Sequence, residues 1–215
     1  MIPRLLVLPY ARWHAARPHV REVAGRPLLV LPGVFDPVLT KVGAWLARAV
    51  APLVRPGERW LDLGTGSGVV ALALARAGAH VVATDVDETA CRNASLNAAL
   101  SGLRLDVRQG DLFAPVQGEQ FDGVVGNLPF WPRATGVPVA HGFAAGPDYE
   151  ILRRFVEGAP AHAPRCLTVL SERFDDFGGA RAALGPAVRL VRRQRHRGEW
   201  MNLFELDRRP AATLR

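Results

Sequence analysis

The sequence predicts an α/β protein with a largely parallel sheet and helices on both faces. Short apolar runs rich in β-branched residues alternate with alanine-rich or amphipathic segments, as parallel sheets require. One apolar run leads straight into a glycine-rich turn and a helix. The 215 residues can bury one sizeable core, and no linker or repeat divides them. We expect a single domain over residues 1–215, with an irregular, strand-containing leader over residues 1–32.

Two elements are predicted before the glycine-rich turn. Residues 28–31 are a short apolar run typical of a strand. Residues 38–53 have the spacing of an amphipathic helix, which Pro56 and Gly57 would end. Residues 60–63 then form a strand with a single carboxylate, Asp62.

The glycine-rich turn is the first candidate site. Its residues of interest are Asp62, Gly64, Thr65, Gly66 and Gly68. Glycines in such a turn allow positive φ and let a ligand approach the backbone. A helix over residues 69–77 follows, and then a strand over residues 80–85 that ends in Asp85. Asp85 lies about twenty residues after Gly64, a distance at which an acid can reach a ribose hydroxyl. The pattern therefore indicates a nucleoside-containing cofactor.

Other glycine-rich motifs fit this turn less well. The spacing is G-x-G-x-G, whereas the dinucleotide-binding fingerprint is G-x-G-x-x-G. A phosphate-binding P-loop needs a Gly-Lys pair, and the single lysine of the chain is Lys41. Ser67 lacks the preceding Gly-x of a hydrolase nucleophile elbow.

The remaining elements continue the alternation. A helix over residues 89–100 has Asp87 or Thr89 as its N-cap, and a strand over residues 105–109 leads to Asp111 and Leu112. The later elements are a strand at 121–126, a helix at 151–159, a strand at 166–170, and a terminal hairpin of strands 188–191 and 200–206 with Gly198 in its turn.

The second candidate site is the loop Asn127-Leu128-Pro129-Phe130, at the end of the strand over residues 121–126. Pro129 has a fixed φ and pushes Leu128 out of the helical region. Such a turn can aim the Asn127 side-chain carbonyl and nearby backbone carbonyls at one point. Carbonyls that accept both N–H bonds of a planar amine or amide would favour positive charge developing on its nitrogen. Phe130 could stack on the flat acceptor.

Together, the glycine-rich turn and the Asn127 loop resemble the two diagnostic motifs of class I S-adenosylmethionine-dependent amino methyltransferases. The resemblance implies a Rossmann-like, seven-stranded, mostly parallel sheet closed by an antiparallel C-terminal strand. It implies S-adenosyl-L-methionine as the cofactor and Asn127, Leu128, Pro129 and Phe130 as the catalytic loop. The cofactor residues it implies are Asp62, Gly64, Thr65, Gly66, Gly68, Asp85, Val86, Asp111, Leu112 and Asn127. In the family, the acid at the position of Asp111 contacts the adenine amino group.

Other segments narrow the resemblance to the HemK-like group. The helix with Asn93 and Asn97 is similar to theirs, and residues 144–155 resemble the helix start that follows their catalytic loop. Phe35, Asp36 and Pro37 resemble the upstream segment that closes over the cofactor. This implies methylation of a protein glutamine side chain. The Asn-Leu-Pro-Phe loop, however, is closer to the rRNA adenine dimethylases, so an amino group of RNA or DNA stays open. A small-molecule amine, or a role as a non-catalytic partner subunit, stays open too.

Charge gives a weaker indication of the partner. The net charge is +7 and the pI about 10.8, which suits an anionic partner. Nearly all of this charge is arginine, which a high-GC genome also produces. A local cluster comprises Arg189, Arg192, Arg193, Arg195 and Arg197. These arginines either contact nucleic acid or protect a solvated sheet edge.

Composition also predicts several absences. Cys91 and Cys166 are isolated, and the histidines lack zinc-ligand spacing, so we expect neither a disulfide nor a metal. No apolar run reaches eighteen residues, and the N-terminus lacks the pattern of a signal peptide. We therefore expect a cytoplasmic protein with no membrane partner; the sequence leaves its oligomeric state open.

Overall fold

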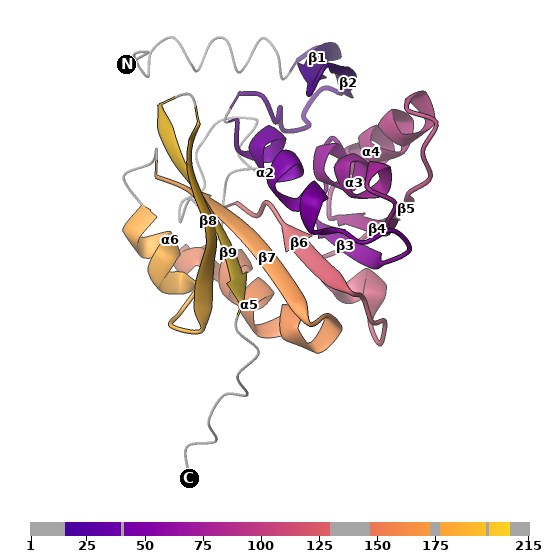
Figure 1. Ribbon diagram of the computed structural model, residues 1–215. Helices are drawn as coiled ribbons and strands as arrows, with labels where there is room; N and C mark the ends of the chain where they lie inside the picture. Colours follow the sequence, from indigo (N-terminus) through magenta and orange to yellow (C-terminus); the bar gives the residue numbers. More distant parts are fainter. Residues whose placement is uncertain (1–15, 40, 130–146, 173–176, 197, 207–215) are drawn as a thin grey trace.

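The computed structural model describes residues 16–39, 41–129, 147–172, 177–196 and 198–206. Its centre is a seven-stranded sheet in the order β5-β4-β3-β6-β7-β9-β8 (Figure 1). The strands are β3 (Arg59–Leu63), β4 (His80–Asp85), β5 (Asp106–Gln109), β6 (Gly123–Gly126), β7 (Arg165–Ser171), β8 (Val188–His196) and β9 (Glu199–Leu206). The first five pair in parallel, and β9 runs antiparallel to both of its neighbours. This confirms the predicted fold class.

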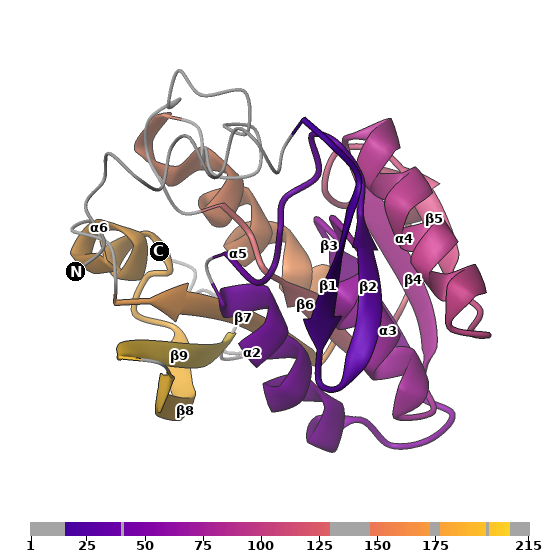
Figure 2. The ribbon, with the colours of Figure 1, turned by 90° about the horizontal axis from the view of Figure 1, so that it is seen from above.

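Helices cover both faces of the sheet, with α2 and α5 on opposite sides (Figure 2). The helices are α2 (Val42–Val50), α3 (Val69–Arg76), α4 (Glu88–Leu100), α5 (Glu150–His162) and α6 (Phe177–Ala183). One buried cluster packs α2 and α3 onto the sheet, and a second packs α5 and α6 onto it. Central strands such as β3 and β6 are buried on both faces, which explains why most of their side chains are apolar.

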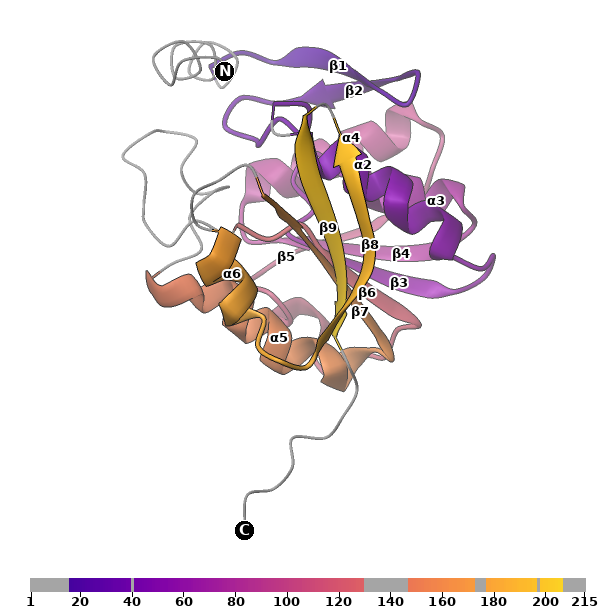
Figure 3. The same ribbon diagram turned by 60° about the vertical axis from the view of Figure 1, so that its left-hand side comes forward.

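The described part of the N-terminal leader, from residue 16 on, contains a regular antiparallel hairpin of β1 (His19–Val23) and β2 (Arg26–Val30). The hairpin lies above α2 and α4, apart from the main sheet (Figure 3). Side chains of α4 join it to the domain. The Asn97 amide accepts from the N–H of Leu29 (2.9 Å) and donates to its C=O (2.7 Å). Asn93 accepts from the N–H of Leu31 (2.8 Å) and donates to the C=O of Leu29 (2.9 Å).

Several boundaries differ from the sequence-based expectations. The helix expected over residues 38–53 begins at Val42, because Lys41 is left-handed (φ 62°), and ends in the 3-10 turn η1 (Ala51–Leu53). Strand β8 continues to His196, so Arg189, Arg192, Arg193 and Arg195 lie within a strand. Helix α6 was not predicted. The N-cap of α4 is Asp87, whose carboxylate accepts from the N–H of Thr89 (2.8 Å).

No helix among the described residues is long and apolar enough to span a bilayer.

Candidate active site

A cleft opens at the carboxyl ends of β3, β4 and β6, where open α/β sheets bind ligands. Most of the sequence-predicted site residues line it together. They are Phe35, Pro37, Asp62, Gly64, Thr65, Gly66, Asp85, Val86, Asp111, Leu112, Asn127, Leu128 and Pro129. The sheet thus brings the glycine-rich turn and the Asn127 loop to one cavity, although about sixty residues separate them in the chain. Phe130 lies outside the described residues.

Asp62 organises the glycine-rich turn from inside. One of its carboxylate oxygens accepts from the Thr65 hydroxyl (2.7 Å) and from the N–H of Ala71 in α3 (3.1 Å). Burial raises the pKa of Asp62 to about 7, against these two hydrogen bonds, which lower it. The carboxyl group therefore joins the turn to α3.

Asp85 ends β4 at the rim of the cleft. Its carboxylate accepts from the backbone N–H groups of Gly66 (2.9 Å) and Asp87 (3.0 Å). Burial raises the pKa of Asp85, and these two bonds oppose the rise. Gly66 has φ 55°, and nothing lies within 4 Å of the place a Cβ would occupy. No side chain of the turn therefore blocks the backbone next to the Asp85 carboxylate, so a ligand with hydroxyl groups can approach both.

Asp111 and Leu112 lie on the loop between β5 and β6. Leu112 is left-handed (φ 44°), a conformation that is unfavourable for a side chain of its size. The Thr84 hydroxyl donates to its carbonyl (3.5 Å). At Gly110, a Cβ would lie 2.4 Å from Cγ of Pro115, so the loop folds tightly on itself. The loop is thus held in one constrained shape at the edge of the cleft.

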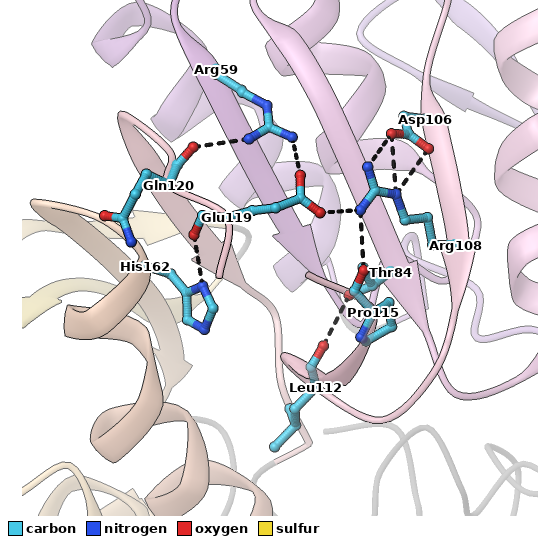
Figure 4. Close-up of polar contacts among 9 residues, drawn as sticks. All are labelled: Arg59, Thr84, Asp106, Arg108, Leu112, Pro115, Glu119, Gln120 and His162. Atoms are coloured by element: carbon cyan, nitrogen blue, oxygen red, sulfur yellow. Dashed lines mark hydrogen bonds and ion pairs between the residues drawn. The ribbon is translucent and has the colours of Figure 1, made fainter. Parts of the chain in front are cut away.

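A polar network closes the base of this loop (Figure 4). Glu119 accepts from both Arg59 of β3 and Arg108 of β5, which lower the pKa of its carboxyl group. Arg108 also donates to the carbonyl of Pro115 (3.1 Å). His162, at the end of α5, has its Nδ1 3.0 Å from the carbonyl of Glu119. Two strands and one helix therefore anchor the segment that carries Asp111.

Asn127 directly follows β6, and α2 approaches it closely. A Cβ on Gly43 of α2 would lie 3.5 Å from Nδ2 of Asn127 and 3.0 Å from Cβ of Pro37. Leu128 is buried; a Cβ on Gly64 would lie 3.7 Å from its Cδ2. The apolar Leu128 side chain thus joins the Asn127 loop to the glycine-rich turn.

Two predicted cofactor residues do not line the cleft. Asp36 is buried behind it, where Oδ2 accepts from Nε of Arg21 (2.6 Å) and lies 3.1 Å from Nε2 of His19. Its other oxygen accepts from the N–H of Val38 (2.9 Å). Gly68 begins α3 and packs on α4, where its Cβ would lie 3.0 Å from Cα of Ala94. Asp36 and Gly68 thus support the segments that form the walls.

Sequence reasoning also missed several residues of the site. Gly33, Val42, Thr84 and Ile151 line the cleft. Arg154 of α5 donates to Oδ2 of Asp111 (2.5 Å). The sequence carried no signal for this pair, because the partners lie on separate elements. No cluster of metal-ligating side chains occurs in the part of the chain that the structure describes.

The chemistry of this donor set fits the nucleoside part of S-adenosyl-L-methionine. Carboxylates accept from ribose hydroxyls and from an adenine amino group, and Asp85 and Asp111 end or follow adjacent strands. Val86 follows Asp85, lines the same cleft and is 67 % exposed, so it offers an apolar surface for a flat base. Asn127 lies in the same cleft, so an acceptor nitrogen could reach a cofactor held there.

Comparison with known proteins agrees with this geometry. Residues 28–160 match the family model "Methyltransferase small domain". The ribosomal protein L11 methyltransferase of Thermus thermophilus is 36% identical over 111 residues, covering 51% of this chain and 44% of that protein. The release factor glutamine methyltransferase of Xylella fastidiosa is 37% identical over 143 residues, which cover 60% of this chain and 52% of that protein.

Solved structures share the fold. The T. thermophilus 16S rRNA N2 G1207 methyltransferase in complex with AdoMet and guanosine has a TM-score of 0.62 at 23% identity, covering 89% of this chain and 50% of that one. The chain spans 44% and 52% of the length of the two curated relatives named above. Since the family model matches more than half of the sequence, the chain belongs to the methyltransferase small domain family.

Proposed function

We propose that this chain is an S-adenosyl-L-methionine-dependent N-methyltransferase acting on a planar amide or exocyclic amino nitrogen. The observation that carries the proposal is that Asn127 shares one cleft with Asp85 and Asp111. The cofactor supplies, when bound, an electrophilic methyl group on a positively charged sulfur. Family membership supports the cofactor and the reaction class, and the side chains in the cleft support the choice of nitrogen as acceptor.

Each wall of the cleft has a distinct task in this proposal. Asp85 accepts from ribose hydroxyls, and the bare backbone of Gly64 and Gly66 allows the cofactor to approach. Asp111 accepts from the adenine amino group. Asn127 accepts an N–H of the acceptor through its side-chain carbonyl and so orients the nitrogen. The remaining contribution is alignment of the reacting atoms, which requires no general base.

Replacement of Asn127 tests this division of tasks. In Asn127→Ala we expect methyl transfer to fall about 100-fold or more, because an acceptor that stabilises developing charge is lost. The Kd for S-adenosylhomocysteine, measured by calorimetry, should stay within about twofold of wild type, because Asp85 and Asp111 are intact. An equal loss of cofactor binding would assign the loop to the cofactor site instead.

The favoured acceptor is a protein glutamine side chain, as the HemK-like segments imply. Support comes from the similarity to the release factor glutamine methyltransferase. To test it, protein and methyl-labelled cofactor are incubated with extract from a strain that lacks the gene. Label removed by protease supports a protein acceptor, and label removed by nuclease contradicts it. Label in small molecules also contradicts it. Cofactor binding without any transfer would favour a non-catalytic partner subunit.

An amino group of RNA or DNA is the second candidate, and strand β8 favours it. Arg192 and Arg195 are exposed on this edge strand and form no ion pair among the described residues. Arg189 and Arg193 pair with Glu205 and Glu172, and Arg197 lies outside the described residues. Gln194 is level with Met201 and hence with Ser171, at the carboxyl end of β7. Arg192 is level with Leu203, which is level with Val169, the residue after the Thr168 that pairs with Gly126. The backbone of Arg192 is therefore level with Asn127, and three strand spacings, about 14 Å in total, separate the two.

Charge reversal tests this second candidate. In Arg192→Glu/Arg195→Glu we expect weaker RNA binding and a salt dependence with a slope lower by about 2, since each arginine would neutralise one phosphate. The matched control is Arg92→Glu/Arg104→Glu. It makes the same charge change at two exposed positions that lie nearer β5, the edge strand opposite β8. Equal effects of the two double variants would show that only net charge attracts RNA.

A further inference from the structure

Helix α5 follows the Asp111 loop along one face. Arg154, Gly158 and His162 are spaced four residues apart, so they lie in a row on the helix. Arg154 donates to Oδ2 of Asp111 (2.5 Å). A Cβ on Gly158 would lie 2.7 Å from Cε2 of Phe113, and the ring of His162 stacks on Phe113 with centroids 4.7 Å apart. The loop and the helix are therefore in close contact over about two turns.

The position of Arg154 is also fixed from the start of its helix. Asp148 and Tyr149, just before α5, are both left-handed (φ 50° and 59°). Non-glycine residues in this conformation persist only where the surrounding structure holds them. Tyr149 is 8% exposed and belongs to the buried cluster on this face of the sheet. Ile151, one turn before Arg154, lines the cleft itself. The helix therefore presents Arg154 at the rim of the cleft from a constrained start.

We propose that Arg154 is a positioning residue that makes the cleft selective for an amino group on the purine. Arg154 holds Oδ2 of Asp111, which leaves Oδ1 to accept a hydrogen bond from the ligand. This inference rests on the proposed function, in which the cleft binds the adenosine part of the cofactor. A carboxylate is an acceptor in both oxygens, and here the arginine occupies one of them. It therefore favours the amino group of adenine over the carbonyl oxygen of hypoxanthine, which would face it as a second acceptor.

The test compares two ligands that differ at this one group. Calorimetry measures the Kd of S-adenosylhomocysteine and of its inosine analogue. We expect wild type to bind the adenosine ligand more tightly than the inosine ligand. In Arg154→Met, the Kd of the inosine ligand divided by the Kd of the adenosine ligand should fall by about threefold to tenfold. This is the effect of losing one oriented hydrogen bond at a half-exposed site. Arg154→Lys should restore part of the preference, because it returns the charge without the planar fork.

The neighbouring residue provides a matched control. Arg153 lies on the same helix and pairs with Asp148, through Nη2 and Oδ2 at 3.2 Å, where Asp148 is 80% exposed. Neither residue lines the cleft. Arg153→Met removes an identical side chain and should leave the ratio of the two Kd values unchanged. Asp111→Asn is the reference for complete loss of the carboxylate.

The outcomes separate this inference from the proposed function. If wild type binds neither ligand, the proposed function fails. If wild type discriminates, and Arg154→Met discriminates equally well while Asp111→Asn does not, Asp111 acts without Arg154 and the inference is overturned. An equal weakening of both ligands in Arg154→Met would also overturn it, because that result reflects a change in overall fold or charge.

Discussion

The side-chain amide of Asn97 forms two hydrogen bonds with the backbone of Leu29: it accepts from the N–H and donates to the C=O. The backbone of a neighbouring strand would satisfy Leu29 in the same way. The same amide nitrogen donates to the carbonyl of Ser67 (2.9 Å) in the glycine-rich turn. A single buried side chain therefore joins the N-terminal hairpin, helix α4 and the candidate cofactor site. The segment from Gly33 to Pro37, which forms one wall of the cleft, follows directly from the strand that Asn97 holds.

Replacing Asn97 with aspartate should destabilise the protein strongly. The change keeps the shape but turns the donating nitrogen into an oxygen that faces two carbonyls. We expect the free energy of unfolding in urea to fall by about 2–4 kcal/mol. In Asn93→Asp, where the nitrogen donates to one carbonyl, the loss should be smaller. Equal losses in both variants would contradict the bridging role of Asn97.

Asp62 should make stability depend on pH. Its pKa in the folded protein is raised to about 7 from an ordinary value of 3.8, mainly by burial. The folded state therefore binds more protons between these values, and the free energy of unfolding should decline as pH rises from about 4 to 7. The stabilisation is complete below pH 4, and its loss by pH 7 amounts to at most about 4 kcal/mol.

Urea unfolding between pH 4.5 and 8 checks this dependence. Asp62→Asn keeps an oxygen that can accept from Thr65 and Ala71 but does not titrate. We expect the variant to have a flatter pH profile than wild type over this range. Parallel profiles would mean that other groups cause the dependence.

Gly43 should matter more for methyl transfer than for folding. In Gly43→Ala the new methyl group would meet Pro37, Val69 and Asn127 at 3.0, 3.4 and 3.5 Å. We expect about 1–3 kcal/mol of destabilisation from overpacking, partly offset by the higher helix propensity of alanine. Since Asn127 must aim at the acceptor nitrogen, kcat should fall further, by about tenfold or more.

The control for this change is Gly178→Ala in α6. Nothing lies within 4 Å of the Cβ position at Gly178, which is exposed. This variant should unfold at the same or a slightly higher urea concentration and keep full activity. A Gly43→Ala enzyme with wild-type kcat would show that α2 does not constrain Asn127.

The sequence predicted those parts of the site that depend on local pattern. Asp85 and Asn127 follow apolar strands, and parallel strands place their carboxyl ends at one edge, so the meeting of these residues could be foreseen. Helix α6 was missed because Gly178 and Gly179 weaken its helical pattern. The late start of α2 depends on the left-handed Lys41, which no propensity indicates.

Long-range contacts account for the other differences. Asp36 stands between two residues that line the cleft, yet its carboxylate turns toward His19 and Arg21 of the hairpin. Arg154 reaches Asp111 across 43 positions of the sequence. Both pairings depend on how separate elements pack, which residue spacing within one element does not specify. The shape of the Leu112 turn likewise depends on Thr84 and on the network around Glu119.

The side-chain attachment of the hairpin has a consequence for hydrogen exchange. The amide protons of Leu29 and Leu31 are bonded to side chains of α4 rather than to the main sheet. They can exchange with solvent when the hairpin lifts, while β3, β4 and β6 stay folded. Their protection against deuterium would therefore report the local opening of one wall of the cleft, and a ligand that contacts this wall would slow exchange at these two amides in proportion to its affinity.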